Sequence, residues 1–370
     1  MEKAYRFRIY PTTEQIVQIQ KTFGCTRYVF NHFLGKRIEI YKTDGTTLNF
    51  AACCSELTEL KKELGWLYEP DSTALQSSLR DLDFAYQNFF RRAKKGWKPG
   101  FPKFKRKRDS RKSYKSKRVG ENIAILDNCV KLPKLGLVKA AISKQAQGRI
   151  LNATVSQNPS GKYFVSVCCT DVDIEPYPST GVTVGLDMGL TDLVITSDDT
   201  IYPNHKHIRK SEKKLARAQR QLSRKQKGSN NWNKARIRVA KIHERVCNQR
   251  RDAIHKMTTQ IIKGNDIICI EDLNVSGMMR NRKLAKSISD AAWGEVKRQL
   301  EYKSDWHGRV LVQIDRFFPS SQLCSCGYRN TDTKDLSVRI WICPECKKVN
   351  DRDINAANNI LKEGLRLLVV

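Results

Sequence analysis

The sequence predicts an α+β protein of two or three domains. Three observations lead to this prediction. Residues 5–10 alternate like a β-strand and are followed by apolar residues at helical spacing, two short apolar runs each end in an acidic residue, and four cysteines stand in two close pairs near the C-terminus. The 370 residues, 40% of them apolar, are enough to bury more than one core.

The N-terminal part combines one strand, several helices and a later group of strands. After the strand at residues 5–10, Thr12 and Gln15 form a capping box, so a helix should begin there. A second amphipathic helix is expected further on, up to about residue 90. Residues 122–140 and 149–170 then alternate again between apolar and polar side chains. We therefore expect a small β-domain that is interrupted by helices.

Residues 91–118, here called the basic strip, are unusually rich in positive charge. They contain fifteen Lys and Arg and one acid, Asp109. Four aromatic residues are interleaved with these charges: Trp97, Phe101, Phe104 and Tyr114. A charge run of this kind is often no more than a solvated surface. The interleaved rings favour a strip that binds nucleic acid, because bases stack on aromatic side chains while cations contact the phosphates.

The whole chain is strongly basic. It has 68 Lys and Arg against 38 Asp and Glu, which gives a formal charge of +30 and an isoelectric point of about 9.8. Such a protein is suited to bind a polyanion, and its affinity should fall steeply with salt. No stretch reaches the roughly 18 apolar residues of a membrane span, and the N-terminus lacks the apolar core of a signal peptide. We expect a cytoplasmic protein with no membrane partner.

The second half of the chain predicts a different domain. Strands are expected at 182–187 and 193–195, with a turn at Gly189 between them. Residues 206–256 carry 18 Lys and Arg and are interrupted near Gly228, which predicts a hairpin of two helices with one face packed and the other lying on phosphates. A strand to Glu271, a helix, a third strand and a final helix follow. This order is that of a ribonuclease-H-like fold.

Three acidic residues in this half are candidates for one metal-binding site. Asp187 and Glu271 each end an apolar strand, and Asp353 opens a helical stretch. Converging buried carboxylates are tolerable only when cations neutralise them, and hard oxygen ligands suit Mg²⁺. Each residue alone also has an ordinary alternative, as a turn residue, an exposed acid or a helix cap. Periodicity does not decide between Asp351 and Asp353, whereas Asp272 should point away from Glu271 because side chains alternate along a strand.

Two closely spaced pairs of cysteines predict a zinc ribbon. Cys324 and Cys326 form the first pair, and Cys343 and Cys346 form the second after sixteen residues. Four thiolates with this grouping bind Zn²⁺ in a closed structural site. The alternative is a set of reduced surface thiols. The first pair has one intervening residue where two are usual, and this departure affects the expected geometry of the ribbon.

Long segments of the chain resemble the TnpB family, the OrfB-type proteins of small bacterial insertion sequences. The segments are FRIYPTTEQ, GFPKFK, VGLDMGLTDLVITSD, SRKQKGSNNWNKAR, NQRRDAIHK, IEDLNVSGMM, SDAAWGEVKRQLEYK, FFPSSQLCSCG, WICPEC and DRDINAANNI. The resemblance implies that Asp187, Glu271 and Asp353 are the three RuvC-type nuclease carboxylates, the last being the second Asp of DRD. It also implies an RNA-guided DNA endonuclease with two catalytic Mg²⁺ ions and one structural Zn²⁺. The guide would be a noncoding RNA from the right end of the element, and the target DNA would need a short adjacent motif.

The resemblance further implies a division into domains. We expect the first strand of a wedge-type β-barrel at 1–10, a helical recognition domain with the basic strip at 11–118, the remainder of the wedge domain at 119–178, a RuvC-like nuclease domain at 179–319, a zinc ribbon at 320–349, and the final RuvC-like motif at 350–370. We expect a monomer associated with the bacterial nucleoid. Two other functions remain open: a nuclease-inactive, RNA-guided repressor, and a guide-independent, structure-specific DNA nuclease.

Overall fold

The computed structural model describes residues 1–108, 112–335 and 337–369, and it divides into two compact units. The N-terminal unit spans Met1–Asp173 and the C-terminal unit spans Ile174–Val370. This division lies a few residues before the boundary expected at 178/179. The two units are described separately below.

The N-terminal unit contains a seven-stranded antiparallel sheet with the order β2-β6-β7-β1-β5-β4-β3. The strands are β1 (Lys3–Tyr10), β2 (Lys112–Lys117), β3 (Ala124–Ile125), β4 (Cys129–Leu132), β5 (Gly136–Ala141), β6 (Arg149–Gln157) and β7 (Tyr163–Thr170). Within the described residues the two edge strands, β2 and β3, do not pair with each other. The expected closed barrel is therefore wrong. β3 has two residues, too few to complete a ladder, and lysines on β2 discourage pairing at the other edge.

Three helices accompany this sheet: α1 (Thr13–Asp44), α2 (Phe50–Glu63) and α3 (Ser72–Lys94). α1 begins with the expected capping box, in which Thr12 and Gln15 exchange backbone and side-chain hydrogen bonds. The Gln15 amide also donates to the carbonyl oxygens of Leu135 and Leu137, which ties the start of the helix to β5. The three helices share an apolar core.

The basic strip begins in α3 and then crosses α1. The Asn31 side chain exchanges two hydrogen bonds, of 2.8 and 2.9 Å, with the backbone of Lys105. The Lys105 ammonium lies 3.9 Å from the centre of the Phe30 ring, and burial lowers its pKa. The strip thus has a fixed path along this helix. Residues 109–111, including Asp109, lie outside the described residues.

The aromatic residues of the basic strip do not all have the expected position. Trp97, Phe101 and Phe104 are about half exposed, as a stacking surface requires. Tyr114 is buried on β2, where its ring lies edge-to-face on Phe23 with centres 5.7 Å apart. The prediction that Tyr114 faces nucleic acid is therefore wrong, because alternation along β2 turns this ring inward and turns Lys115 and Lys117 outward.

The C-terminal unit contains a five-stranded sheet with the order β10-β9-β8-β11-β12. Its strands are β8 (Thr183–Asp187), β9 (Asp192–Thr196), β10 (Ile201–Pro203), β11 (Ile267–Glu271) and β12 (Val310–Ile314). β8, β11 and β12 are parallel, while β9 and β10 run antiparallel. The helices are α4 (His207–Ser223), α5 (Asn230–Gly264), α6 (Val275–Met278), α7 (Ala285–Ala291), α8 (Trp293–His307) and α9 (Arg352–Val369). The predicted order of strands, helical hairpin and final helix is confirmed.

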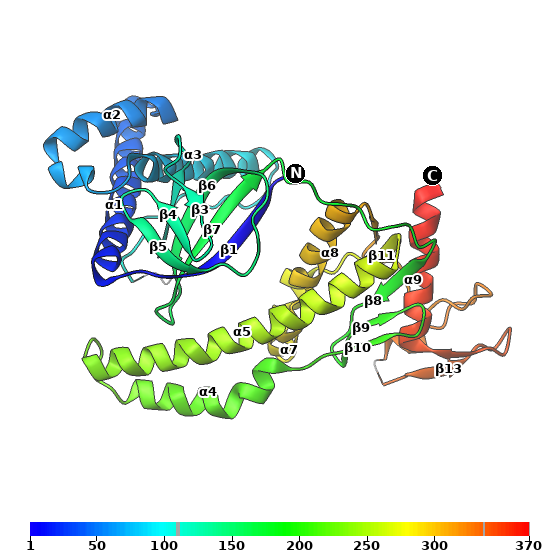
Figure 1. Cartoon of the computed structure of the whole chain (residues 1–370). Helices are drawn as coiled ribbons and strands as arrows, with labels where there is room; N and C mark the ends of the chain where they lie inside the picture. Colours follow the sequence, from blue (N-terminus) through cyan, green and yellow to red (C-terminus); the bar gives the residue numbers. More distant parts are fainter. Residues whose placement is uncertain (109–111, 336, 370) are drawn as a thin grey trace. The chain divides into compact units, whose positions relative to one another are not determined.

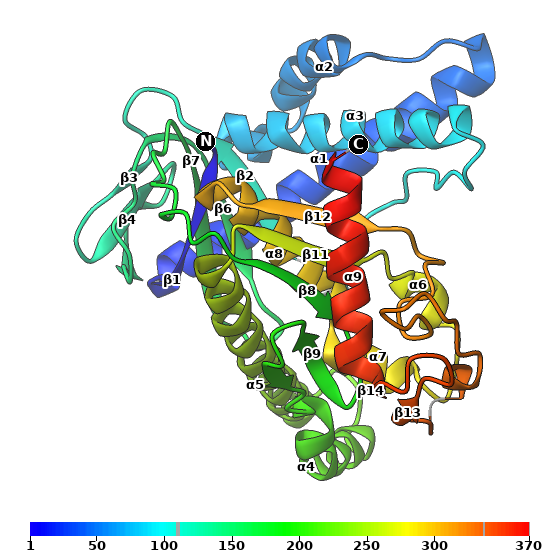
Figure 2. The same ribbon diagram turned by 90° about the vertical axis from the view of Figure 1, so that its right-hand side faces the viewer.

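Helices cover both faces of this sheet (Figure 2). Ile268 and Ile270 of β11 face one side and share a core with residues of α5 and α8. Cys269, between them, faces the other side and packs with Ile360 of α9. The approach of α9 is very close, because a Cβ atom on Gly185 would lie 2.0 Å from the carbonyl oxygen of Ala357. Glycine at this position lets the helix lie directly on β8.

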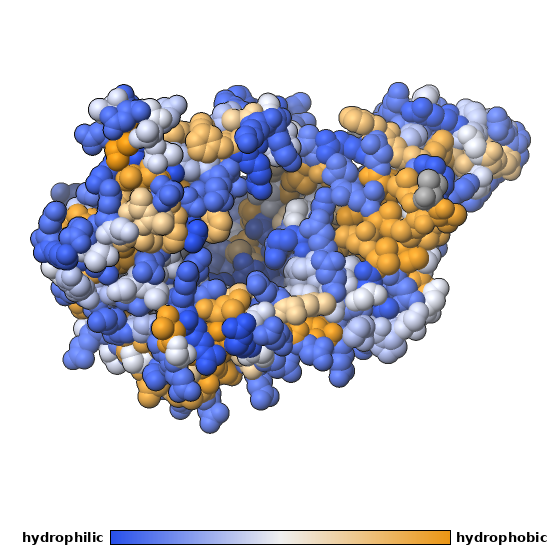
Figure 3. Space-filling model, turned by 90° about the horizontal axis from the view of Figure 1, so that it is seen from above, coloured by the Kyte–Doolittle hydropathy of each residue, from blue (hydrophilic) through white to orange (hydrophobic). Residues whose placement is uncertain are grey.

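The last turn of α9 exposes apolar side chains. Leu367 and Leu368 are about half exposed, and Val369 is almost fully exposed. Figure 3 shows apolar surface gathered on the right of the view, where α9 lies in Figure 1. None of the helices in the described part of the chain combines the length and hydropathy needed to cross a bilayer.

Candidate functional site

Asp187 and Glu271 lie at neighbouring strand ends. β8 and β11 are parallel, and Leu186 pairs with Ile270 in their register. The next residue on each strand is the acid, so the two carboxylates lie at the same edge of the sheet. Both strands are short and apolar, and in each of them the residues directly before the acid are buried. The predicted placement of these two side chains agrees with this geometry.

Asp353 reaches the same region from the first turn of α9, which packs on β8. The charges of Glu271 and Asp353 both act on the Asp187 carboxyl group. Burial, followed by the charges of Glu271 and Asp353, raises the pKa of Asp187 to about 7. Burial also raises the pKa of Glu271, and a hydrogen bond from the Ser320 hydroxyl partly offsets this rise. Buried carboxylates that repel one another form a site suited to cations.

Asp351 has a different role from Asp353. One oxygen of its carboxylate accepts hydrogen bonds of 3.0 Å from the backbone N–H groups of Asp353 and Ile354. Asp351 therefore caps the N-terminus of α9, and its carboxylate is engaged there. The Asp353 carboxylate takes no part in this cap.

Asp272 points away from the site, as alternation along the strand predicts. Its carboxylate accepts hydrogen bonds from Arg316 and Gln313, and the Lys297 ammonium lies 3.8 Å away. These partners hold its pKa below the usual range. Asp272 is thus an ion-paired surface residue, and it offers a matched control for substitutions of Glu271 and Asp187.

Arg339 contacts the site and was not predicted from the sequence. One of its guanidinium nitrogens lies 2.8 and 3.2 Å from the two carboxylate oxygens of Asp353. The Arg339 carbonyl oxygen accepts a 2.8 Å hydrogen bond from the backbone of Arg352. A cation therefore partly neutralises Asp353. The segment between the cysteine pairs shows no periodicity that would single out Arg339. Ser320, which precedes the first pair, is one of two adjacent serines, and no pattern in the sequence distinguishes it from the other.

The three carboxylates are not drawn together as one tight cage. Among the described residues, the only group of His, Cys, Asp or Glu ligand atoms that could share a single ion is formed by four cysteines. Looser spacing fits Mg²⁺, which keeps several of its waters and is usually held by one or two carboxylates together with substrate phosphates. Carboxylates from three separate elements can also surround two ions.

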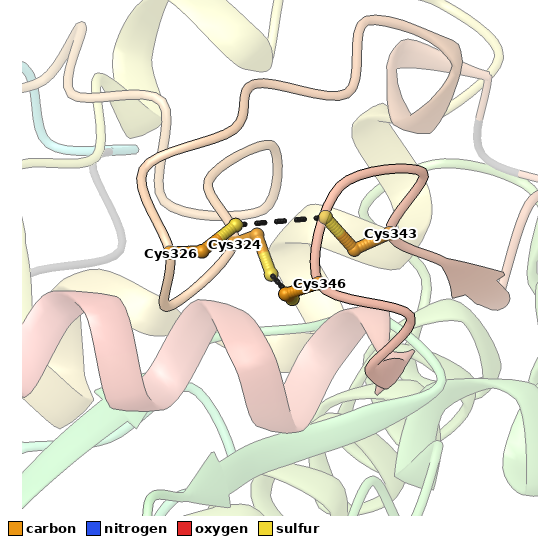
Figure 4. Close-up of side chains that lie close together, drawn as sticks. All are labelled: Cys324, Cys326, Cys343 and Cys346. Carbon is orange, nitrogen blue, oxygen red and sulfur yellow. Dashed lines mark hydrogen bonds between the residues drawn. The ribbon is translucent and has the colours of Figure 1, made fainter.

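The four cysteines meet as the sequence predicts (Figure 4). The sulfurs of Cys324, Cys326, Cys343 and Cys346 all lie within 4.8 Å of one another. Cys324 and Cys346 are 3.5 Å apart, and Cys326 and Cys343 are 3.6 Å apart. Four bonds of about 2.3 Å to a tetrahedral ion would place sulfurs about 3.8 Å apart. The donor set and its spacing therefore fit one structural metal ion, despite the short first pair.

The cysteine cluster is joined directly to the carboxylate site. The second pair lies between β13 (Ile340–Ile342) and β14 (Val349–Asp351), which pair antiparallel, and α9 begins at the next residue. Arg339 immediately precedes β13. The small core of the cluster includes the buried Trp341 ring. The fold of this module consequently sets the positions of both Arg339 and Asp353.

Three family models match successive parts of the chain. Residues 166–282 match the OrfB_IS605 family, described as "Probable transposase", and residues 293–360 match the family described as "Cas12f1-like, TNB domain". Residues 1–46 match a family described as "Helix-turn-helix domain"; in this structure they contain β1 and α1.

Relatives match almost the whole chain. A Streptomyces pristinaespiralis protein, named as an RNA-guided DNA endonuclease, is 40% identical over 99% of this chain and 90% of its own length. InsQ of Escherichia coli K12 carries the same description and is 34% identical over 99% of this chain and 93% of its own length. These full-length matches define a class, the transposon-encoded proteins named as RNA-guided nucleases. Within that class, the chain belongs to the TnpB family, the OrfB-type proteins of insertion sequences.

A solved structure shares the fold. The protein in a Cas12f1–sgRNA–target DNA complex superimposes with a TM-score of 0.64, covering 97% of this chain and 98% of that one, at 13% sequence identity. The similarity therefore lies in the arrangement of helices and strands, and the expected mixed α and β fold is confirmed.

Proposed function

We propose that this chain is an RNA-guided DNA endonuclease of a bacterial insertion sequence. It would hydrolyse phosphodiester bonds of target DNA beside a short adjacent motif. The observation that carries the proposal is the meeting of Asp187, Glu271 and Asp353 at one edge of the sheet, in a chain whose full-length relatives carry this description. The C-terminal sheet, with three parallel strands after an antiparallel hairpin, supports a ribonuclease-H-like nuclease domain.

The three carboxylates would hold two Mg²⁺ ions. Ions held by these carboxylates would supply the chemistry of phosphodiester hydrolysis, which is activation of a water and stabilisation of negative charge on the phosphodiester oxygens. Ser320 orients the Glu271 carboxylate through its hydrogen bond. Burial and the two neighbouring acids raise the pKa of Asp187 to about 7, so a cation bound at this carboxylate would displace a proton from it. Arg339 holds Asp353 in place and contributes positive charge beside the DNA phosphate.

The four-cysteine cluster would hold one structural Zn²⁺. All four ligands come from the protein, so no position is left for a water or a substrate. The ion would therefore act through folding, by ordering the hairpin of β13 and β14 that leads into α9.

A guide RNA and double-stranded target DNA are the proposed partners. Base pairing to a guide supplies sequence specificity, so the protein needs mainly positive charge to hold the backbones. The formal charge of +30 supports this assignment. We assign the helical part at 11–118, with its basic strip, to recognition of the adjacent motif and of nucleic acid backbones. The location would be the bacterial cytoplasm, on the nucleoid.

Cleavage of a plasmid library tests the proposed function. The protein is co-expressed with the transcript of the right end of its element and mixed with plasmids that carry the matching target beside randomised sequence, in Mg²⁺. We expect cutting beside one short motif, only when the transcript is present. Target binding without cutting would indicate a repressor, and cutting without RNA would indicate a guide-independent nuclease.

A further inference from the structure

Two buried asparagines, here called the asparagine pair, lie on α9 beyond Asp353. Asn355 and Asn359 are one turn apart, so their side chains project from the same face of the helix. Both are less than a tenth exposed. A buried amide costs free energy unless it is hydrogen-bonded, whereas an apolar side chain would carry no such cost. Asparagine at both positions therefore points to a requirement for the hydrogen bonds themselves.

The asparagine pair binds the loop that leads into the cysteine module, residues 318–323. The Asn359 amide nitrogen donates hydrogen bonds of 2.7 Å to the carbonyl oxygens of Ser320 and Leu323. The Asn355 amide nitrogen donates a further bond of 2.7 Å to the carbonyl oxygen of Leu323. The loop is thus held against α9 at two of its carbonyl groups.

Ser320 joins this loop to the carboxylate site. Its carbonyl oxygen accepts the hydrogen bond from Asn359, and its hydroxyl donates to a carboxylate oxygen of Glu271. Ser320 is buried, and its backbone N–H donates a 2.8 Å hydrogen bond to the carbonyl oxygen of Phe318, which fixes the turn of the loop. Among the residues that the structure describes, no other group donates a hydrogen bond to the Glu271 carboxylate. The position of Ser320 therefore determines how this carboxylate is oriented.

One helix consequently sets the positions of two of the three acids. Asp353 stands in the first turn of α9, and the asparagine pair follows on the same helix. Asp353 is placed by the helix directly, whereas Glu271 is placed through the loop and Ser320. Mg²⁺ demands near-ideal octahedral geometry, so a small rotation of either carboxylate would weaken its binding. A rigid connection between the two acids meets this demand before any ion binds.

We propose that Asn355 and Asn359 are positioning residues of the nuclease site, which fix Ser320 so that its hydroxyl holds the Glu271 carboxylate ready for a metal ion. The proposal rests on the function proposed above. The amide nitrogens of the pair bond to backbone carbonyl groups and not to the carboxylate, so both residues act through the loop. Hydrogen-bond partners behind a metal ligand orient it, and loss of one typically lowers metal affinity or activity by about 10-fold to 100-fold.

The test is a double-variant cycle in the full chain. Single-turnover cleavage of a matched target duplex is measured over a range of Mg²⁺ concentrations for RNA-loaded wild type, Asn359→Ala, Ser320→Ala and the combined variant. Asn358→Ala is the matched control, because this neighbouring side chain is exposed and donates its hydrogen bond within α9. Binding of Mn²⁺, which takes the same oxygen ligands as Mg²⁺, is measured on the RNA-free chain by electron paramagnetic resonance. Elemental analysis gives the zinc content of each variant.

We expect Asn359→Ala to cut about ten-fold more slowly, to need more Mg²⁺ for its half-maximal rate, and to bind Mn²⁺ about ten-fold more weakly. The combined variant should cut no more slowly than Ser320→Ala, within about two-fold, because Asn359 acts through Ser320. The zinc content of Asn359→Ala should equal that of the wild type. Asn358→Ala should match the wild type in every measurement.

Several results would overturn the proposal. Wild-type cleavage and Mn²⁺ affinity in Asn359→Ala would show that the asparagine does not position Glu271. Slowing that multiplies in the combined variant would show that Asn359 acts independently of Ser320, and loss of zinc would show that it supports the cysteine module instead. If Asn359→Ala does not fold, Asn355→Ala takes its place in the cycle under the same criteria. Its expected effect is smaller, about three-fold, because Asn359 still holds the loop.

Failure of this proposal can be separated from failure of the proposed function. If wild-type protein cuts its target only with RNA but Asn359→Ala behaves like Asn358→Ala, only the positioning role fails. If wild-type protein cuts without RNA, or does not cut at all, the proposed function itself fails, and Mn²⁺ binding still tests the asparagine pair.

Discussion

The carboxyl group of Asp187 is buried at the end of β8, and burial with two neighbouring acids raises its pKa to about 7. In an unfolded chain the pKa of this group is near 4. The folded, metal-free protein therefore binds a proton here more tightly than the unfolded chain does. The resulting contribution to stability is present at low pH and is lost as pH rises from about 4 to about 7.

This gives a prediction for Asp187→Asn, which keeps the shape of the side chain and removes its ionisation. In Mg²⁺-free buffer the variant should gain stability over the wild type as pH rises, by roughly 4 kcal/mol at most above pH 7. The measurement is the thermal unfolding midpoint of the C-terminal unit between pH 5 and pH 8, with Mg²⁺ added back to the wild type. A stability difference that stays constant across this range would contradict the account.

Arg339 gives a second prediction. Its ion pair with Asp353 is partly exposed, so Arg339→Gln should cost less than about 1 kcal/mol of stability. Cleavage by a pre-formed complex should nevertheless slow by about ten-fold to a hundred-fold, because a positive charge beside the transition state is removed. Single-turnover rates measure this effect. The matched control is Arg329→Gln, which removes another arginine of the same module and should cut at the wild-type rate. If the wild type, Arg339→Gln and Arg329→Gln all cut at the same rate, Arg339 takes no part in cleavage.

The sequence predicts the site only where residues stand next to a recognisable pattern. Asp187 and Glu271 follow buried strands, and the alternation that excludes Asp272 is visible in the same strand. In the sequence, Asp351 and Asp353 both stand at the start of the same helical stretch, and only the capping hydrogen bonds separate their roles. Arg339 could not be predicted, because its position depends on the path of an irregular loop.

At the scale of elements, the cysteine module is the part of the fold that should become disordered when its metal ion is removed. Four thiol groups drawn together without an ion cost free energy, and structural zinc binding contributes about 10 kcal/mol or more to folding in comparable small modules. The module carries Arg339 and leads into Asp353, so its unfolding should disorder the carboxylate site as well.

We therefore predict about one zinc ion per chain after dialysis, and none in Cys343→Ser/Cys346→Ser. Metal content is measured by elemental analysis, together with target cleavage and RNA affinity. Cleavage should be abolished in the double variant while RNA affinity stays within about three-fold of the wild type. Cys247→Ser is the matched control, because this exposed thiol lies outside the cluster, and it should keep both the metal and the activity. Full zinc content in the double variant would refute the ligand assignment.

The elements themselves could be predicted from the sequence wherever they depend on local patterns. The capping box of α1, the strand ends at the acids and the break between α4 and α5 are confirmed. Closure of the N-terminal sheet was predicted wrongly, because it depends on pairing between strands far apart in the chain. The position of Tyr114 was also predicted wrongly: its lysine neighbours favour a charged surface, whereas alternation along β2 buries its ring.

At the scale of the whole molecule, the positive charge should govern nucleic acid affinity. Lys105 is a poor place to test the basic strip, since its ammonium packs on Phe30. Lys103 and Lys107 are exposed and belong to the same strip. Lys103→Gln/Lys107→Gln should weaken nucleic acid binding and reduce the salt slope by about one for each phosphate that is no longer neutralised. An unchanged slope would indicate that the strip is only a solvated surface.

The central claim is that a guide-loaded complex cuts DNA with the carboxylates of Asp187, Glu271 and Asp353. Its most direct test is single-turnover cleavage of a matched target duplex by RNA-loaded Asp187→Ala, with Asp272→Ala as the matched control. We predict that both variants bind RNA and target with wild-type affinity, that the control cuts normally, and that Asp187→Ala does not cut. Cleavage by Asp187→Ala at the wild-type rate would contradict the claim, and failure of that variant to bind would show that Asp187 supports the fold instead.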